Sequence, residues 1–282
     1  MGRKIYHPNS GGGNHLTMKV VLFCGGMGMR IREASEALPK PLVHIGDRPI
    51  LLHLMKYYAH YGHKEFILCL GYKGEAIKDY FLNYNETLAN DFTLASGQNQ
   101  VTLLSNEMKD WTISFVNTGL NTTIGMRLKA VEKYLKDDEY FLANYADGLA
   151  DIPLDELIKD HYEQNKVASF VAVQPKQTFH MVDSKEDGSV IGIKEMSSSS
   201  IWVNGGFFVF KREIFNYIKH GDELVNQPFQ RLIAEKQLLT HRSEGYWACM
   251  DTFKEKQELD ELYASGDMPW AVWRELPNLC LA

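Results

Sequence analysis

A glycine-rich turn near the start of the chain is the first segment whose residues suggest chemistry. Gly25-Gly26-Met27-Gly28-Met29-Arg30 directly follows a short apolar run. Backbone N–H groups in such a turn can bind phosphate oxygens, and the Arg30 guanidinium can neutralise a triphosphate in fixed geometry. The turn is neither a dinucleotide fingerprint, because Ile31 stands at the last glycine position, nor a P-loop. Glycine turns alone are common, so the prediction of a nucleotide site depends on Arg30.

A second cation follows in the segment Leu38-Pro39-Lys40-Pro41-Leu42. The two prolines restrict the backbone around Lys40 to an extended form, which gives its ammonium group a defined direction. The alternative is a solvated lysine in a surface turn. Because the glycine-rich turn lies just upstream, we predict that Lys40 is a second phosphate-binding cation.

Alternating strands and helices are predicted to position these groups. A buried strand at 19–24 ends at the glycine-rich turn, and a strand at 140–145 ends just before Asp147. The complete predicted order is strand 19–24, helix 50–61, strand 65–70, helix 75–84, strand 111–117, helix 125–135, strand 140–145, helix 153–165 and strand 167–173. This alternation predicts an α/β fold with a doubly wound, mostly parallel sheet, whose ligands gather at the carboxyl ends of the strands.

The rest of the chain departs from this alternation. Residues 91–110 are polar and predict an inserted hairpin or a mobile flap, and strands at 190–194 and 201–210 predict a smaller β region. Helices are expected at 213–219, 227–236 and 254–265. We predict one domain over residues 18–282, with halves of about 18–150 and 151–282, since no linker is long enough to separate them. Residues 1–17 are polar and glycine-rich and are expected to be a tail or an added extension before Met18.

Composition excludes several classes of protein. The 282 residues carry a formal net charge of −6, which argues against a nucleic-acid-binding surface. No apolar run approaches the roughly 20 residues that span a bilayer, and the start has no secretory signal. The cysteines show no metal-binding spacing and are expected to be reduced, buried thiols of a cytoplasmic protein: Cys24, Cys69, Cys249 and Cys280.

Several motifs in one order resemble the sugar-phosphate nucleotidyltransferases. They begin with Gly-Gly-x-Gly-x-Arg, Pro-Lys-Pro and Ile-Gly-x-x-Pro-Ile (Ile45–Ile50), and the resemblance extends from Met18 to Trp273. Within that family the chain is most similar to the glucose-1-phosphate cytidylyltransferases. The motifs behind this narrower resemblance are Gly71–Gly74, Thr118-Gly119, Gly125–Lys129, Asp147–Asp151, Ala172–Pro175, Trp202–Phe208 and Met250–Thr252. The resemblance implies a Rossmann-like nucleotidyltransferase fold in which the smaller β region lies on the acceptor side.

The resemblance also assigns roles to individual residues. Asp147 and Asp251 are expected to hold Mg²⁺, which prefers hard oxygen ligands, although an aspartate after a strand is also a common turn or cap residue. Arg30, Lys40 and Asp147 are expected to be catalytic. The expected CTP site consists of Phe23, Cys24, Gly25, Gly26, Met27, Gly28, Met29, Arg30, Lys40, Thr122, Arg127 and Ala146.

The expected acceptor site departs from the family pattern. The resemblance places Lys194, Glu195, Asn204 and Gly205 at the acceptor, with Glu195 binding sugar hydroxyls. The family's Glu-Lys-Pro reads Glu195-Met196-Ser197 here, and a thioether cannot neutralise the acceptor phosphate. Another cation must do so, or the acceptor differs, and the candidates are Lys194, Lys176 and Lys185.

Two further departures are smaller. Thr178-Phe179-His180 replaces Arg-Phe-Gly in a loop that closes over the sugar, so a side chain stands where backbone approaches the ligand. Tyr145-Ala146-Asp147-Gly148 replaces Tyr-Gly-Asp-Gly and is the milder change.

The implied reaction joins CTP and a sugar 1-phosphate, with glucose 1-phosphate as the first choice, to give a CDP-sugar and pyrophosphate. An acceptor oxygen attacks the α-phosphorus in line, and no general base is needed because that oxygen is already anionic. The alternatives are a cytidylyltransferase for a different or modified acceptor and a nucleotide-binding homologue without activity, which Met196 motivates. The expected partners are CTP and a phosphorylated small molecule, with neither nucleic acid nor membrane, and the resemblance implies a homo-oligomer.

Overall fold

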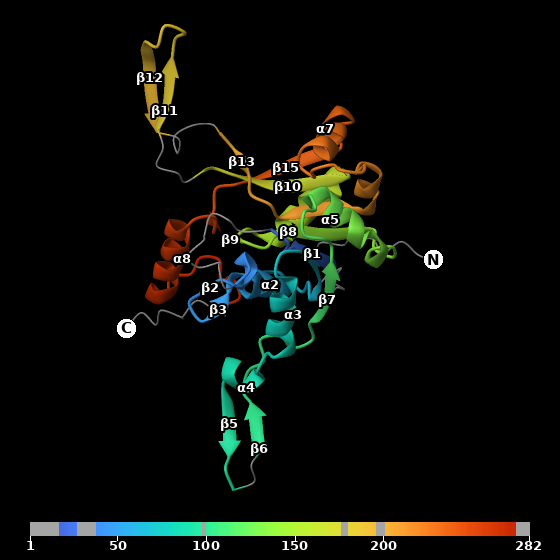
Figure 1. Ribbon diagram of the computed structural model, residues 1–282, viewed down its shortest axis with the longest axis vertical. Helices are drawn as coiled ribbons and strands as arrows, with labels where there is room; N and C mark the ends of the chain where they lie inside the picture. The colour runs from blue at the N-terminus through green and yellow to red at the C-terminus, as the bar shows by residue number, and fades with distance from the viewer. Residues whose placement is uncertain (1–16, 27–37, 98–99, 176–179, 196–200, 275–282) are drawn as a thin grey trace.

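A computed structural model of the protein describes residues 17–26, 38–97, 100–175, 180–195 and 201–274. Within these ranges the centre of the molecule is an eight-stranded sheet (Figure 1). Its strands are β1 (Lys19–Phe23), β4 (Glu65–Leu70), β7 (Thr112–Asn117), β8 (Tyr140–Tyr145), β10 (Ala168–Val173), β13 (Val203–Asn204), β14 (Phe208–Lys211) and β15 (Leu238–Ser243).

The sheet is mixed but mostly parallel, which confirms the predicted fold class. β1 pairs in parallel with β4 and β8, β4 with β7, and β10 with β15. β14 is antiparallel to both β8 and β10, and β13 is antiparallel to β10. Strands β8, β10 and β15 therefore run in the same direction as β1, so their carboxyl ends reach the same edge of the sheet. In open α/β sheets this edge is where ligands bind.

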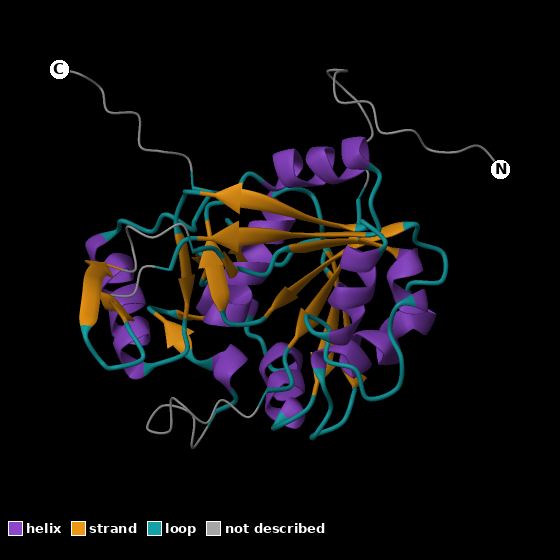
Figure 2. Cartoon of the chain, turned by 90° about the horizontal axis from the view of Figure 1, so that it is seen from above, coloured by secondary structure: helices purple, strands orange, loops and turns teal. Residues whose placement is uncertain are grey.

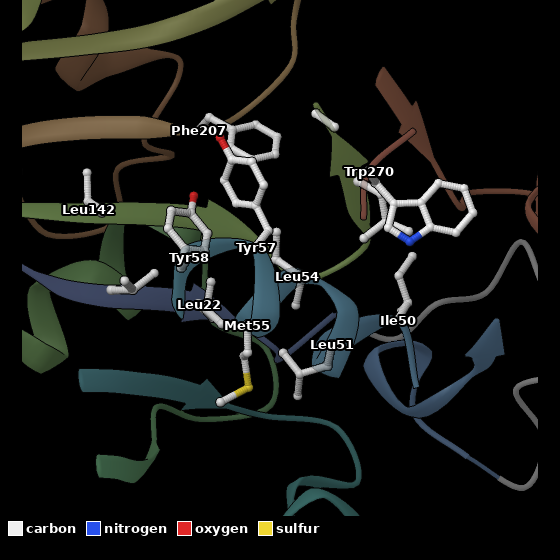
Figure 3. Packing of buried hydrophobic residues seen from close by; sticks show 14 of the residues in the cluster. Leu22, Ile50, Leu51, Leu54, Met55, Tyr57, Tyr58, Leu142, Phe207 and Trp270 are labelled. Carbon is white, nitrogen blue, oxygen red and sulfur yellow. The ribbon is translucent and has the colours of Figure 1, made fainter. Parts of the chain in front are cut away.

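Helices cover both faces of the sheet (Figure 2). They are α2 (Ile50–His60), α3 (Gly74–Leu82), α5 (Ile124–Val131), α6 (Leu154–Gln164), α7 (Gln227–Ala234) and α8 (Phe253–Ser265). One core cluster unites α2 with residues of both predicted halves, including Leu22, Leu142 and Phe207. The inward side chains of α2 in this cluster are Ile50, Leu51, Leu54, Met55, Tyr57 and Tyr58 (Figure 3). A second cluster packs α5 and α7 on the opposite face.

Two hairpins project from opposite ends of the molecule (Figure 1). β5 (Phe92–Ala95) pairs with β6 (Gln100–Leu103) beyond the short helix α4 (Glu86–Ala89), so the insertion predicted at 91–110 contains a hairpin. β11 (His180–Ser184) pairs with β12 (Val190–Glu195) at the other end. Large apolar side chains on both hairpins are exposed, because each strand pairs only with its hairpin partner.

Some boundaries differ from those predicted. The strand predicted at 201–210 is divided into β13 and β14, because Gly206 and Phe207 adopt positive φ angles of 80° and 50°. The helix predicted at 213–219 is a 3-10 helix, η4 (Arg212–Asn216). The helix predicted at 125–135 ends at Val131 and continues as the 3-10 turn η2 (Glu132–Tyr134). In the described part of the chain, no helix is long and apolar enough to cross a membrane.

Candidate active site

Lys40 opens a tight turn at the carboxyl edge of the sheet. The turn is the 3-10 helix η1 (Lys40–Leu42), which is followed by the small hairpin β2 (His44–Ile45) and β3 (Arg48–Pro49). Pro39 is extended as predicted, but Lys40 is the first residue of the turn and is not in an extended run. The difference has a simple cause, since Pro41 lacks an N–H and is tolerated in the first turn of a helix. Buried Pro41 and Leu42 then anchor the turn and fix the origin of the lysine side chain.

Asp147 is positioned by strand pairing across a long stretch of sequence. It follows β8 and precedes β9 (Gly148–Ala150), which pairs with β16 (Trp247–Cys249). The N–H of Met250 donates to the Asp147 carbonyl at 2.9 Å. This antiparallel contact places Asp251 beside Asp147, as expected of the two carboxylates.

The start of helix α8 holds Asp251 in place. Thr252 is the N-cap residue, and it forms a capping box with Glu255. The Glu255 Oε2 atom also accepts hydrogen bonds from the N–H of Asp251 at 2.8 Å and of Thr252 at 2.7 Å. A capping box fixes the direction in which the chain enters a helix, so the Asp251 backbone is fixed on both sides.

The three charged groups meet at one point. Lys40 Nζ lies 2.6 Å from Asp147 Oδ2 and 2.6 Å from Asp251 Oδ1. Burial alone would lower the pKa of Lys40, but hydrogen bonds and charge attraction from the two carboxylates outweigh it and raise the pKa. The ammonium group is therefore charged at neutral pH. It bridges the two carboxylates and is the cation on which their oxygens converge.

The same oxygens could hold a metal ion. Donor atoms of Asp147, Asp251 and Cys249 all lie within 4.8 Å of one another. Carboxylate oxygens suit a hard divalent cation, whereas a thiol does not. Burial raises the pKa of Cys249, so its thiol is neutral. The two carboxylates are therefore the donors that fit a divalent metal ion. The Lys40 ammonium is a second positive charge next to them.

The described part of the predicted nucleotide loop leads toward this cluster. Phe23 and Cys24 are buried, and Gly26 is exposed. The N–H of Cys24 donates to the Cys69 carbonyl at 3.0 Å, which extends the pairing of β1 with β4 to the loop. Ala146 is buried next to Asp147, and Thr122 is partly exposed in the loop before α5. Met27, Gly28, Met29 and Arg30 lie outside the described residues, so their roles stay predictions.

Arg127 clamps the loops that surround the expected nucleotide site. Only 2% of the residue is exposed. Its guanidinium donates to Thr118 Oγ1 at 2.7 Å and to four backbone carbonyls, those of Gly25, Leu70, Gly119 and Leu120. A methyl group on Gly25 would come within 2.2 Å of the guanidinium, so only glycine allows this approach. The structure shows a buried positioning residue, and contact between Arg127 and CTP stays a prediction.

The predicted acceptor residues lie farther out. Lys194 and Glu195 are exposed on β12. Asn204 is also exposed, and its Nδ2 donates to the Tyr145 hydroxyl at 3.2 Å. Gly205 is buried, and its carbonyl accepts from Trp247 Nε1 at 2.9 Å. Asn204 and Gly205 thus lie next to β8, whereas Lys194 and Glu195 belong to the projecting hairpin.

Sequence reasoning did not find Trp247, which lines a cavity of about 130 Å³ beside Gly205. The other lining residues are Val173, Gln174, Pro175, Ser243, Glu244 and Gly245. The only signal in the sequence is the position of Trp247 four residues before Asp251. Met196, Lys176, Thr178 and Phe179 lie outside the described residues.

Comparison with known proteins identifies relatives of the whole region that contains the site. Residues 19–254 match the family model described as nucleotidyl transferase. A probable glucose-1-phosphate cytidylyltransferase of Bacillus subtilis is 39% identical over 258 residues, which are 91% of this chain and 100% of the relative. The glucose-1-phosphate cytidylyltransferase of Salmonella typhimurium is 36% identical over the same shares. The crystal structure of HddC from Yersinia pseudotuberculosis is 19% identical with a TM-score of 0.62, covers 88% of this chain and 100% of its own, and shares the fold.

Proposed function

Because the chain belongs to the nucleotidyl transferase family, we propose that it transfers the cytidylyl group of CTP to a sugar 1-phosphate, with glucose 1-phosphate as the first choice. The products are a CDP-sugar and pyrophosphate. The observation that carries this proposal is the convergence of Lys40, Asp147 and Asp251 on one point at the carboxyl edge of the sheet. The two cytidylyltransferase relatives match over their full lengths, which supports cytosine as the base.

The chemistry follows from these charges. An anionic oxygen of the acceptor phosphate forms a bond to the α-phosphorus of CTP while the bond from that phosphorus to the β-phosphate oxygen breaks. The electron pair and negative charge leave with pyrophosphate, so no proton has to be moved. A magnesium ion held by Asp147 and Asp251 would neutralise phosphate charge when bound.

The protein's own groups orient the reactants. The Lys40 ammonium contacts both carboxylates and can stabilise charge that develops on the phosphates. Arg30 is proposed to act on the triphosphate from the glycine-rich turn. Holding the two phosphates in line makes their reaction effectively unimolecular, which removes the entropic cost of bringing two anions together.

A modified acceptor is the second candidate, and Met196 favours it. A different phosphorylated sugar would use the same nucleotide half and the same metal carboxylates. A homologue without activity is less well supported, since the three charged groups of the cluster are present and in contact. A homo-oligomer, a cytoplasmic location and a role in supplying nucleotide sugars for polysaccharide assembly stay part of the proposal.

The test is a matrix of nucleoside triphosphates against sugar phosphates, scored by pyrophosphate release. We expect turnover with CTP and a sugar 1-phosphate in the presence of Mg²⁺, and its loss when EDTA is added. Turnover with another triphosphate at higher kcat/KM would overturn the assignment of CTP. Tight CTP binding without turnover on any acceptor would favour the inactive homologue.

A further inference from the structure

The segment that carries two of the predicted acceptor residues turns sharply between β13 and β14. This acceptor turn, residues 204–207, contains Gly206 and Phe207 at positive φ angles of 80° and 50°. Glycine adopts this conformation freely, whereas a bulky residue such as Phe207 is strained by it. Such strain persists only where the surrounding structure holds it. The Phe207 ring packs against Tyr57 and Tyr58 of α2, which holds one side of the turn (Figure 3).

Asn144 of β8 holds the backbone of the acceptor turn. Only 1% of the residue is exposed. Its Oδ1 atom accepts hydrogen bonds from the N–H of Phe207 at 3.0 Å and from the N–H of Tyr145 at 2.9 Å. A Cβ on Gly206 would lie 2.3 Å from the same oxygen, so only glycine allows the turn to come this close. One buried oxygen therefore joins the acceptor turn to the carboxyl end of β8.

The carboxamide of Asn144 is out of place in the apolar core. The three residues before it on β8 are fully buried and apolar: Phe141, Leu142 and Ala143. Burial of a polar side chain costs free energy unless hydrogen bonds replace those it made with water. The two backbone N–H groups that donate to Oδ1 offset this cost, and one of them belongs to the acceptor turn. The side chain therefore serves the turn and not the apolar packing around it.

The acceptor turn is also attached to the chain on both sides of Asp147. Asn204 Nδ2 donates to the Tyr145 hydroxyl at 3.2 Å, and Asp147 follows Tyr145 by two residues. The Gly205 carbonyl accepts from Trp247 Nε1 at 2.9 Å, and Trp247 lies on β16, which pairs with β9 directly after Asp147. The position of the turn is therefore fixed relative to the carboxylate at which the acceptor phosphate has to react.

From these contacts we infer that Asn144 is a positioning residue, which sets the place of the acceptor turn relative to Asp147. The inference rests on the proposed function, because the turn belongs to the proposed acceptor site. Since Asn144 is buried, it acts through the backbone of the turn and not by contact with a reactant. Asn204 Oδ1 accepts from the N–H of Gly206 at 2.9 Å, so a shift of that backbone moves the Asn204 side chain with it.

The main experiment compares Asn144→Leu with the wild-type protein. Leucine has the same branched shape but no oxygen for the turn. The kcat/KM for glucose 1-phosphate should fall about 10- to 100-fold, because a displacement of about 1 Å from the productive geometry can cost about 100-fold. The KM for CTP should change less than about twofold, whereas a general loosening of the fold would raise both KM values.

Two further variants complete this comparison. Asn144→Asp keeps an oxygen at the Oδ1 position and should recover most of the lost kcat/KM. Ser169→Ala is the matched control, because it removes another buried side-chain hydrogen bond of the central sheet, the one with His161. Its kcat/KM for glucose 1-phosphate should stay within about twofold of the wild type. Thermal unfolding identifies a folding defect, and Asn144→Ala carries the test if Asn144→Leu does not fold.

A double-mutant cycle shows whether Asn144 acts through the turn. In the Asn204→Ala background, Asn144→Leu should lower kcat/KM several-fold less than in the wild type, because the side chain that it positions is already absent. Fully additive losses would overturn the inference. Unchanged kinetics in Asn144→Leu, or equal rises in the KM for CTP and for glucose 1-phosphate, would overturn it as well.

A separate measurement keeps the inference distinct from the proposed function. Calorimetric titration with glucose 1-phosphate, in the presence of saturating CDP, reports binding without turnover. If the wild-type protein releases no pyrophosphate but binds glucose 1-phosphate more tightly than Asn144→Leu does, the proposed function fails and the inference stands. If the wild type turns over normally and Asn144→Leu binds glucose 1-phosphate as tightly, the inference fails alone.

Discussion

The charged cluster at the end of β8 and the β11–β12 hairpin are built in opposite ways. Lys40, Asp147 and Asp251 come from distant parts of the chain and are held by strand pairing, a buried turn and a helix cap. Lys194 and Glu195 come from one exposed hairpin that pairs only with itself. The chemistry therefore depends on the central fold, whereas part of the acceptor region can change in sequence at little cost to stability.

The contrast explains where the sequence departs from the family pattern. Lys40, Asp147 and Asp251 are retained and lie at the carboxyl edge of the central sheet. His180 is the first residue of β11, and Met196 directly follows β12 in the sequence. An exposed hairpin position such as His180 tolerates replacement at little cost to stability.

The largest effect is expected from removing one of the two carboxylates that are proposed to hold the metal. Asp147→Asn or Asp251→Asn keeps the side-chain shape but leaves one charge to hold the metal, so kcat should fall on the order of 10³-fold. Pyrophosphate release measures the loss. Asp138→Asn, which removes a partner of Lys19 away from the site, is the control. A comparable loss in Glu195→Gln would show that the hairpin and the cluster do not differ in this way.

Replacing Lys40 should affect turnover and metal binding in opposite directions. In Lys40→Met, kcat should fall about 100-fold because a cation for the phosphates is lost. Binding of Mn²⁺ without nucleotide should tighten about tenfold, because the ammonium no longer competes for the two carboxylates. Electron paramagnetic resonance of free Mn²⁺ gives the affinity. Weaker Mn²⁺ binding would show that Lys40 and the metal do not share the carboxylates.

Removing the Arg127 clamp should destabilise the nucleotide half. Arg127→Met removes five hydrogen bonds that join separate loops, so the free energy of unfolding should fall by about 2–4 kcal/mol. Urea titration followed by circular dichroism measures it, with Lys254→Met on the exposed face of α8 as the control. A loss of CTP affinity with unchanged stability would instead make Arg127 a direct ligand.

The smallest effect concerns pH and a buried histidine of the acceptor half. His161 on α6 bonds Ser169 Oγ at 2.9 Å, and burial lowers its pKa to about 4. As pH falls from about 6.5 to about 4, the unfolded chain binds a proton that the folded chain excludes, so stability decreases by up to about 3 kcal/mol. Between pH 7.5 and pH 5, the wild type should lose about 2 kcal/mol more than His161→Gln in urea titrations. Equal losses in both proteins would remove His161 as the cause.

The sequence predicted the parts of the fold that depend on local pattern. Apolar runs located the strands, and the position of Asp147 after β8 predicted its place at the carboxyl edge. Local pattern could not predict that Gly206 and Phe207 would divide a strand, because the Asn144 side chain that accepts from the Phe207 N–H is 63 residues away.

The contacts that define the site were also beyond local pattern. Lys40 and Asp147 are 107 residues apart, and no spacing rule brings them to 2.6 Å. The family resemblance placed Arg127 in the CTP site, but local pattern gave no sign that its side chain is buried and bonded to Thr118 and four backbone carbonyls. The resemblance supplied these residues as a list, and the fold gives the reason that they belong together.

The capping box beside Asp251 has a consequence for dynamics. Thr252 and Glu255 keep the first turn of α8 closed, and the amide of Asp251 is bonded to the same Glu255 carboxylate. Fraying of this helix end would release the amide and the carboxylate of Asp251 in one motion. Hydrogen exchange at the Asp251 amide therefore reports how often the site opens, and exchange should slow when a divalent metal and nucleotide bind.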